Sequence, residues 1–159
     1  MNKPRILICP LNWGLGHASR CIPIIHALLD AGAEPIIAAD KGPMELLRSE
    51  FPTLEYLHFP GVEVKYPEQG QNMTWSMLSQ TPAILRGIKN ITAFINKIEV
   101  AYQLSGLISD NRFGAYSSRI PSVYVSHQLF IQTGNALTDK LAFIKHRQYM
   151  QKYTRVWIP

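Results

Sequence analysis

Short β-rich runs alternate with helix-patterned segments along the chain, and this alternation limits the possible folds more than any other feature. The runs at 5–9, 34–39 and 53–59 are separated by periodic apolar segments at 18–32 and 43–51. Neighbouring parallel strands need a long crossover between them, and that crossover is usually a helix. The pattern therefore predicts an α/β fold, with a doubly wound, Rossmann-like parallel sheet and helices on both faces.

The second half of the chain continues the alternation. Isoleucines recur every three or four residues from Ile84 to Ile98, which predicts a helix packed on the sheet, capped by Thr81 and with Pro82 in its first position. Further expected elements are a polar loop at 59–75, a buried strand at 104–110, a short helix and turn at 112–121, a strand at 122–128, a helix at 137–153 and a last strand at 154–159.

Length and composition limit the domain count. With 159 residues and 47% hydrophobic residues, the chain can bury one core, and no shift in composition divides it, so 1–159 is expected to be one domain. The sequence contains neither a long membrane-spanning run nor a signal peptide, which predicts a cytoplasmic protein. Cys9 and Cys21 stand at no metal-ligand spacing, so buried thiols are expected and no metal site is predicted.

Positive charge gathers near the C-terminus, within a formal net charge of +5. A solvated helix face is the more common explanation, ahead of contact with phosphates or an anionic membrane. A non-catalytic module that binds polyanions stays an alternative, and it would show steep salt dependence. Nucleic acid is not an expected partner. The basic residues are Lys140, Lys145, Arg147, Lys152 and Arg155, opposed by Asp139.

A glycine-containing turn follows the first predicted strand, in the run NWGLGHASR at 12–20. Gly14 and Gly16 allow a ligand to approach the backbone closely, and the first amides of the following helix are left without partners. The helix dipole favours an anion there. Phosphate or substrate binding is therefore predicted for Gly14, Leu15 and Gly16, with Arg20 within reach unless it is an ordinary surface residue.

The turn matches part of the dinucleotide fingerprint G-x-G-x-x-G. Its third glycine is replaced by Ser19, while Asp40 follows the second predicted strand, where a ribose-binding acid would lie. An NAD(P)-binding oxidoreductase domain therefore stays the main alternative.

His17 is the candidate general base of this turn. The field at a helix start disfavours the protonated ring, and such a base needs an acid to orient it. In a sheet of order 3-2-1-4-5 the strand ending in Asp110 lies beside the first strand, so both residues are expected at the same edge. His127 follows the next strand at that edge and is a further candidate for substrate or phosphate binding. A helix cap for His17 and a structural strand end for His127 stay open. Structural or surface roles are expected for His26, His58 and His146.

Three runs carry a resemblance to a known family: PLNWGLGHASRCIPIIHALLDAGAEPIIAAD, ISDNRFGAYSSRIPSVYVSHQ and RVWIP. Together they resemble the N-terminal half of GT-B glycosyltransferases, above all the group of the N-acetylglucosaminyltransferase that forms lipid II, and more loosely UDP-glycosyltransferases. The resemblance implies an inverting enzyme that moves a sugar from a nucleotide-sugar, a UDP-sugar, to an acceptor hydroxyl. It also implies an acceptor-binding N-terminal domain followed by a C-terminal donor-binding domain outside this chain, as the final apolar strand suggests.

The resemblance assigns roles to single residues. His17 matches the general base of plant-type members and Asp110 the acid that orients it, whereas in the lipid II enzymes the same turn is associated with diphosphate. This chain lacks the paired glycines of those enzymes and has no acid directly after His127. The acceptor is therefore left open: a sugar, a lipid-linked molecule or a small molecule. No cofactor beyond the nucleotide-sugar is implied, and peripheral contact with the inner face of the membrane stays an alternative.

Overall fold

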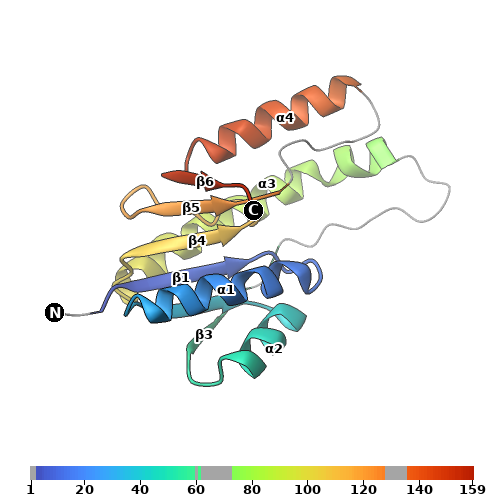
Figure 1. Cartoon of the computed structure of the whole chain (residues 1–159). Coiled ribbons are helices and arrows are strands. Elements are labelled where there is room, and N and C mark those ends of the chain that lie inside the picture. The colour runs from blue at the N-terminus through green and yellow to red at the C-terminus, as the bar shows by residue number, and fades with distance from the viewer. Residues whose placement is uncertain (1–2, 60, 62–72, 128–135) are drawn as a thin grey trace.

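Six parallel strands form one sheet in the part of the chain that the structure, a computed structural model, describes: residues 3–59, 61, 73–127 and 136–159. The strand order is 3-2-1-4-5-6, as Figure 1 shows, so the predicted order is confirmed and extended by one strand. The strands are β1 (Arg5–Pro10), β2 (Glu34–Ala39), β3 (Glu55–His58), β4 (Gly106–Asp110), β5 (Ser122–Val125) and β6 (Arg155–Trp157).

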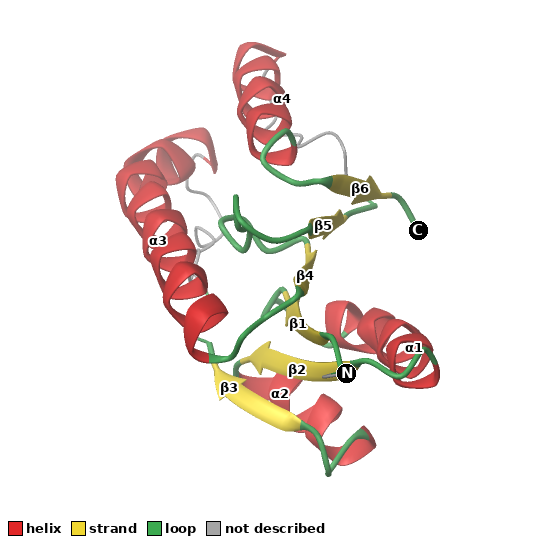
Figure 2. Ribbon diagram, turned by 90° about the vertical axis from the view of Figure 1, so that its left-hand side faces the viewer, coloured by secondary structure: helices red, strands yellow, loops and turns green. Residues whose placement is uncertain are grey.

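Helices cover both faces of the sheet, as predicted (Figure 2). On one face lie α1 (Gly16–Asp30) and α2 (Lys41–Glu50), and on the other lie α3 (Met73–Ala101) and α4 (Ala136–Met150). Because a crossover between parallel strands is right-handed, helices change faces where the chain changes its direction across the sheet. That change falls between β1 and β4, the two strands at the centre.

Alternate residues of the central strands enter two separate cores. Leu7 and Cys9 pack with Ile91 and Ile95 beneath α3, whereas Ile8 packs on the opposite face with α1 and α2. Successive strand residues point to opposite faces, and here helices cover both. This is why the strands are nearly continuous apolar runs, and it confirms that the isoleucine stripe of α3 packs on the sheet.

Two predicted elements are wrong. Helix α3 begins at Met73, so Thr81 and Pro82 lie inside the helix rather than at its start. Pro82 is exposed, and water can there take the place of the one amide donor that proline lacks. The predicted loop at 59–75 accordingly ends earlier, and its residues 60 and 62–72 lie outside the described part.

The predicted short helix at 112–121 is also absent, because its polar side chains hold that segment in an irregular loop. Ser117 donates a hydrogen bond to Glu99 of α3 at 2.5 Å, and Arg119 pairs with the same carboxylate at 2.9 Å. Gly114 adopts a φ of +86° so close to α3 that a Cβ would lie 2.5 Å from the carbonyl oxygen of Ile88. These contacts replace the helical hydrogen bonds that the segment would otherwise make.

The basic residues of α4 and the segment after it are all exposed, which agrees with a solvated face. Leu141 and Ile144 are exposed on the same helix. Within the described residues, no helix has the length and apolar character needed to cross a membrane. Contact with a membrane or another anionic partner therefore stays a prediction.

Both cysteines are buried and unpaired, as predicted, so we expect them to be unreactive in the folded chain. Burial raises the pKa of the Cys9 thiol to about 12, and it raises that of Cys21 further. Iodoacetamide at pH 8 should label neither thiol in buffer and both in denaturant, since the thiolate is the nucleophile. Rapid labelling of either thiol in the native chain would contradict this burial.

The same shift predicts how stability changes with pH. Unfolded thiols ionise near their ordinary pKa of 9.0, while the folded ones keep their protons. The unfolded state therefore binds fewer protons above pH 9, and the free energy of unfolding should fall by up to about 1.4 kcal/mol per thiol for each pH unit. Urea unfolding at pH 8, 9 and 10 measures the slope, and the part contributed by the thiols should be lost in a Cys9→Ala, Cys21→Ala variant.

Candidate functional site

The candidate site lies at the carboxyl ends of β1, β4 and β5. Register places Pro10 of β1 beside Asp110 of β4, and Asp110 beside Val125 of β5. Helices α1 and α3 leave this edge toward opposite faces of the sheet. In open parallel sheets such a switch point is where ligands bind.

The turn between β1 and α1 exposes backbone to this edge. Gly14 has a φ of +74°, a left-handed conformation that favours glycine. Leu15 occupies the N-cap of α1 without capping it through its side chain, and a Cβ on Gly16 would meet no atom within 4 Å. The first amides of α1 therefore have no side-chain cap, and the space beside them is open. Such a helix start can bind an anionic group. Ligand binding by these three residues stays a prediction.

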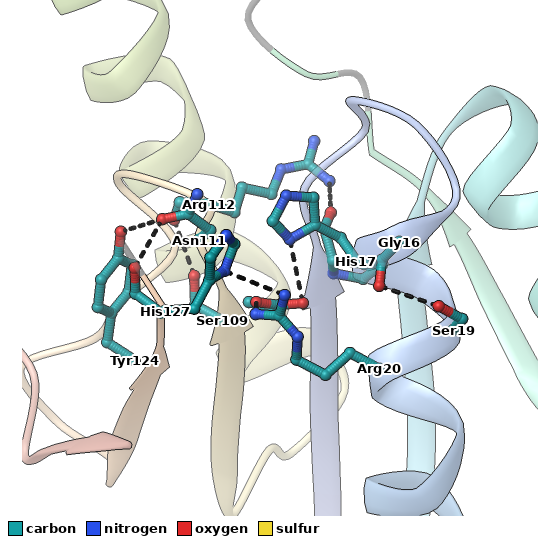
Figure 3. Close-up of polar contacts among 12 residues, drawn as sticks. Gly16, His17, Ser19, Arg20, Ser109, Asn111, Arg112, Tyr124 and His127 are labelled. Carbon is teal, nitrogen blue, oxygen red and sulfur yellow. Dashed lines mark hydrogen bonds and ion pairs between the residues drawn. The ribbon is translucent and has the colours of Figure 1, made fainter. Parts of the chain in front are cut away.

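His17 and Asp110 meet, as the strand order predicted. Figure 3 shows His17 of this pair beside Arg20. The His17 Nδ1 lies 3.2 Å from Oδ2 of Asp110, whose side chain is 0% exposed, and the His17 side chain is 13% exposed. An ionised carboxylate only accepts hydrogen bonds, so Nδ1 carries a hydrogen, and in the neutral ring the lone pair is then on Nε2. This tautomer can remove a proton from a ligand through Nε2.

Arg20 joins the same carboxylate to a second histidine. It donates to Oδ1 of Asp110 at 3.2 Å and to Nδ1 of His127 at 3.0 Å, so this partly exposed arginine is tied to the site edge. Since guanidinium has no acceptor, His127 accepts at Nδ1 and keeps its hydrogen on Nε2. The rings of His17 and His127 lie 6.3 Å apart between centroids. One presents an acceptor and the other a donor, while direct phosphate contacts by Arg20 and His127 stay predictions.

The charges of this cluster cancel. The carboxylate of Asp110 and the guanidinium of Arg20 form an ion pair, and Arg20 is only 25% exposed. A fully buried carboxylate needs such a partner, since an unpaired buried charge is costly. The two histidines are therefore oriented through a charge-balanced pair.

Arg112 is a structural part of this edge that the sequence analysis missed. It follows β4, its residue is 1% exposed, and its guanidinium lies 3.8 Å from the centre of the Phe59 ring. It donates to the carbonyl oxygens of Pro10 at 3.3 Å and Ala38 at 3.4 Å, and also to that of Phe59. Burial lowers its pKa to about 10. Arg112 thus ties together the chain at the ends of three strands.

Asn111 was also missed, although its position directly after Asp110 at a strand end was a usable signal. Its φ is 55°, in the left-handed region that asparagine tolerates better than most residues. Its Oδ1 accepts hydrogen bonds from the Tyr124 hydroxyl at 2.8 Å and from Ser126 Oγ at 3.2 Å. Side chains in β5 and directly after it therefore fix the orientation of this amide.

Asp40 makes contacts that bear on the dinucleotide alternative. Its carboxylate caps α2 by accepting from the backbone amide of Lys41 at 2.9 Å, and the same Oδ1 lies 3.0 Å from Nε2 of His58. These internal donors give Asp40 a structural role at the start of α2.

His58 and His26 are exposed, and His146 is buried, as structural or surface roles require. In the described residues, no three potential ligands cluster as a metal site would require.

No family model and no curated protein matches the chain. Solved structures do. A Listeria monocytogenes protein assigned as a UDP-N-acetylglucosamine 2-epimerase matches 100% of the chain and 40% of its own length, with a TM-score of 0.57 and 13% identity. The spinosyn rhamnosyltransferase SpnG matches 98% of the chain and 45% of its own length, with a TM-score of 0.51 and 16% identity. Phytolacca americana UGT2, complexed with UDP-2fluoro-glucose and pterostilbene, matches 79% of the chain and 31% of its own length, with a TM-score of 0.52 and 19% identity.

The chain spans less than half the length of each of these proteins. At such low identity the likeness concerns the fold alone. The sheet order, the two helical layers and these structures together lead to one conclusion: the chain has the Rossmann-like α/β fold found in GT-B glycosyltransferases.

Proposed function

We propose that this chain is the N-terminal, acceptor-binding domain of an inverting glycosyltransferase. The observation that carries the proposal is the pair formed by His17 and buried Asp110, 3.2 Å apart at the switch point of the sheet. In its neutral form the His17 ring offers the Nε2 lone pair while its other nitrogen is held by an acid, which is the arrangement of a general base. The GT-B-type fold supports the same assignment.

In the proposed reaction, His17 Nε2 removes the proton of an acceptor hydroxyl as the hydroxyl oxygen attacks the anomeric carbon of the donor sugar. The bond from that carbon to the nucleoside diphosphate breaks on the opposite side, so the configuration inverts. Asp110 stabilises the imidazolium that forms, and Arg20 holds the second carboxylate oxygen. The residues Gly14, Leu15 and Gly16, with the first amides of α1, face the diphosphate that develops charge.

The proposal extends to the parts of the enzyme beyond the site. The donor is a UDP-sugar held mainly by a second, C-terminal domain, and the reaction needs neither a metal ion nor a further cofactor. The protein works in the cytoplasm. Exposed Leu141 and Ile144 among the basic residues of α4 are suited to peripheral contact with the inner face of the membrane.

Calorimetric titration of the 159-residue chain separates this function from the dinucleotide alternative. We expect no micromolar binding of NADH or NADPH, because Ser19 replaces the third glycine of the fingerprint and Asp40 caps α2. UDP should bind weakly, since only the first amides of α1 would contact its diphosphate. Micromolar binding of either dinucleotide, abolished by Asp40→Ala, would overturn the transferase proposal in favour of an oxidoreductase.

A further inference from the structure

A hydrogen-bond chain leads from α4 to the site edge. His146 of α4 is buried and its Nε2 lies 3.3 Å from the hydroxyl of Tyr124, which is also fully buried. The Tyr124 hydroxyl donates to Asn111 Oδ1 at 2.8 Å. The ring of Phe113 packs edge-on against His146, with centroids 5.3 Å apart. Three side chains from three parts of the chain are thus linked in series.

The number of hydrogens on each polar group determines which group donates in each hydrogen bond of this series. Burial raises the pKa of the Tyr124 phenol well above its ordinary value of 10.0, so its single hydrogen is retained. That hydrogen goes to Asn111, so the phenol oxygen accepts from His146. Ser126 also donates to Oδ1 of Asn111, at 3.2 Å. Two hydroxyl donors therefore hold the amide oxygen of Asn111 on the β5 side.

The amide nitrogen of Asn111 is then turned away from those hydroxyls. In the described part of the chain, no residue accepts a hydrogen bond from this Nδ2. Asn111 is half-buried and directly follows Asp110, the partner of His17, and Figure 3 shows it in the same group of side chains as His127. An oriented amide with two uncommitted hydrogens, next to a candidate base, can bind an oxygen of a ligand.

The charge balance of the site indicates what kind of ligand oxygen the amide of Asn111 would bind. Asp110 and Arg20 neutralise each other. Among the described residues, the donors left at this side are Nδ2 of Asn111, an amide, and Nε2 of His127, whose Nδ1 accepts from Arg20 and so carries no hydrogen. Neutral donors suit hydroxyl or carbonyl oxygens, whereas phosphates are usually met by uncommitted cations or helix amides.

We propose that Asn111 is an acceptor-binding residue that donates a hydrogen bond to a second, uncharged oxygen of a hydroxylated acceptor, and that Tyr124 and His146 are positioning residues for its amide. The proposal rests on the proposed function, and it adds the substrate class: an acceptor with an oxygen besides the one that reacts. A sugar and a polyhydroxylated aromatic molecule both have this property.

The first test concerns the amide itself in the ¹⁵N-labelled 159-residue chain. The side-chain NH₂ signals of Asn111 are identified by their loss in Asn111→Asp. Tyr124→Phe removes the hydroxyl that fixes the amide, so it should shift these signals. Tyr116→Phe is the matched control, because its hydroxyl bonds to Lys152 outside this hydrogen-bond chain. Unchanged Asn111 signals in Tyr124→Phe would overturn the positioning role of Tyr124.

The second test is the kinetics of the full-length protein, with UDP-glucose or UDP-N-acetylglucosamine as donor and methyl glycosides, catechol and phenol as acceptors. Asn111→Asp keeps the oxygen that Tyr124 and Ser126 contact and tolerates the left-handed backbone, but it removes both amide hydrogens. We expect the acceptor KM to rise about tenfold and the donor KM to stay unchanged, as the loss of one substrate hydrogen bond predicts. The double variant with Tyr124→Phe should be no worse than Asn111→Asp alone.

The outcomes separate the two proposals. Absence of transfer by the wild-type protein overturns the proposed function and this inference with it. Transfer by the wild type with an unchanged acceptor KM in Asn111→Asp overturns the Asn111 assignment alone. A preference for phenol over catechol overturns the requirement for a second acceptor oxygen.

Discussion

His17→Ala is expected to lower the kcat of sugar transfer in the full-length protein by about 10²- to 10⁴-fold, the usual contribution of a general base. The KM values for donor and acceptor should change little, because the alanine removes the proton acceptor and not the ligand contacts. His17 is held through Nδ1 by Asp110 at 3.2 Å, which leaves Nε2 for the acceptor. Steady-state kinetics with a UDP-sugar donor measures the loss.

Two further variants sharpen this experiment. Asp110→Asn should cost less than His17→Ala, because it disturbs the orientation of the ring and not its capacity to take a proton. His58→Ala is the matched control, since His58 also lies 3.0 Å from a carboxylate, that of Asp40, but at the end of β3 and away from Asp110. If His17→Ala keeps full turnover, the base assignment is wrong, whatever the other variants do.

Arg112→Met is expected to lower the free energy of unfolding by about 3 kcal/mol. The variant leaves the carbonyl oxygens of Pro10, Ala38 and Phe59 without their buried donor, at about 1 to 3 kcal/mol for each unsatisfied group, partly offset because no cation is buried. It also loses the stacking on the Phe59 ring. For a chain of this size the midpoint of thermal unfolding should fall by about 6 to 12 °C.

Urea denaturation measures this loss, and two variants test its cause. Arg112→Lys keeps a cation but not the planar, forked donor, so it should recover only part of the stability. Arg48→Met is the control for an exposed arginine that also lies over an aromatic ring, that of Tyr56, and it should change stability by less than about 0.5 kcal/mol. A loss in Arg112→Met no larger than in Arg48→Met would show that the strand ends do not depend on Arg112.

Local patterns account for the elements of this fold and for part of the site. Apolar runs such as those at 5–9 and 34–39 are strands because both of their faces are covered, and their alternation with helices leaves few ways to order a parallel sheet. The handedness of the crossovers then brings Asp110 beside the strand that precedes His17. This is why the meeting of these two residues, which are 93 positions apart, was predictable.

Other features depend on contacts that no local pattern contains. The local sequence around Pro82 predicts the start of a helix there, yet α3 begins at Met73. Residues 112–121 have a helical pattern, but Glu99 and the backbone of Ile88 on α3 hold them in a loop.

The sequence by itself thus determined the fold class, the strand order and the pairing of His17 with Asp110. The spacing of apolar side chains identifies the strands and helices, and the handedness of the crossovers then limits the order of the strands. Only the tertiary structure decided the partners of Arg20, Arg112 and Asn111. Each of these side chains is polar and at least partly buried, so its hydrogen bonds must be completed by whichever groups the packed elements bring near. Which carbonyl, hydroxyl or carboxylate that is depends on the three-dimensional arrangement of strands far apart in the chain.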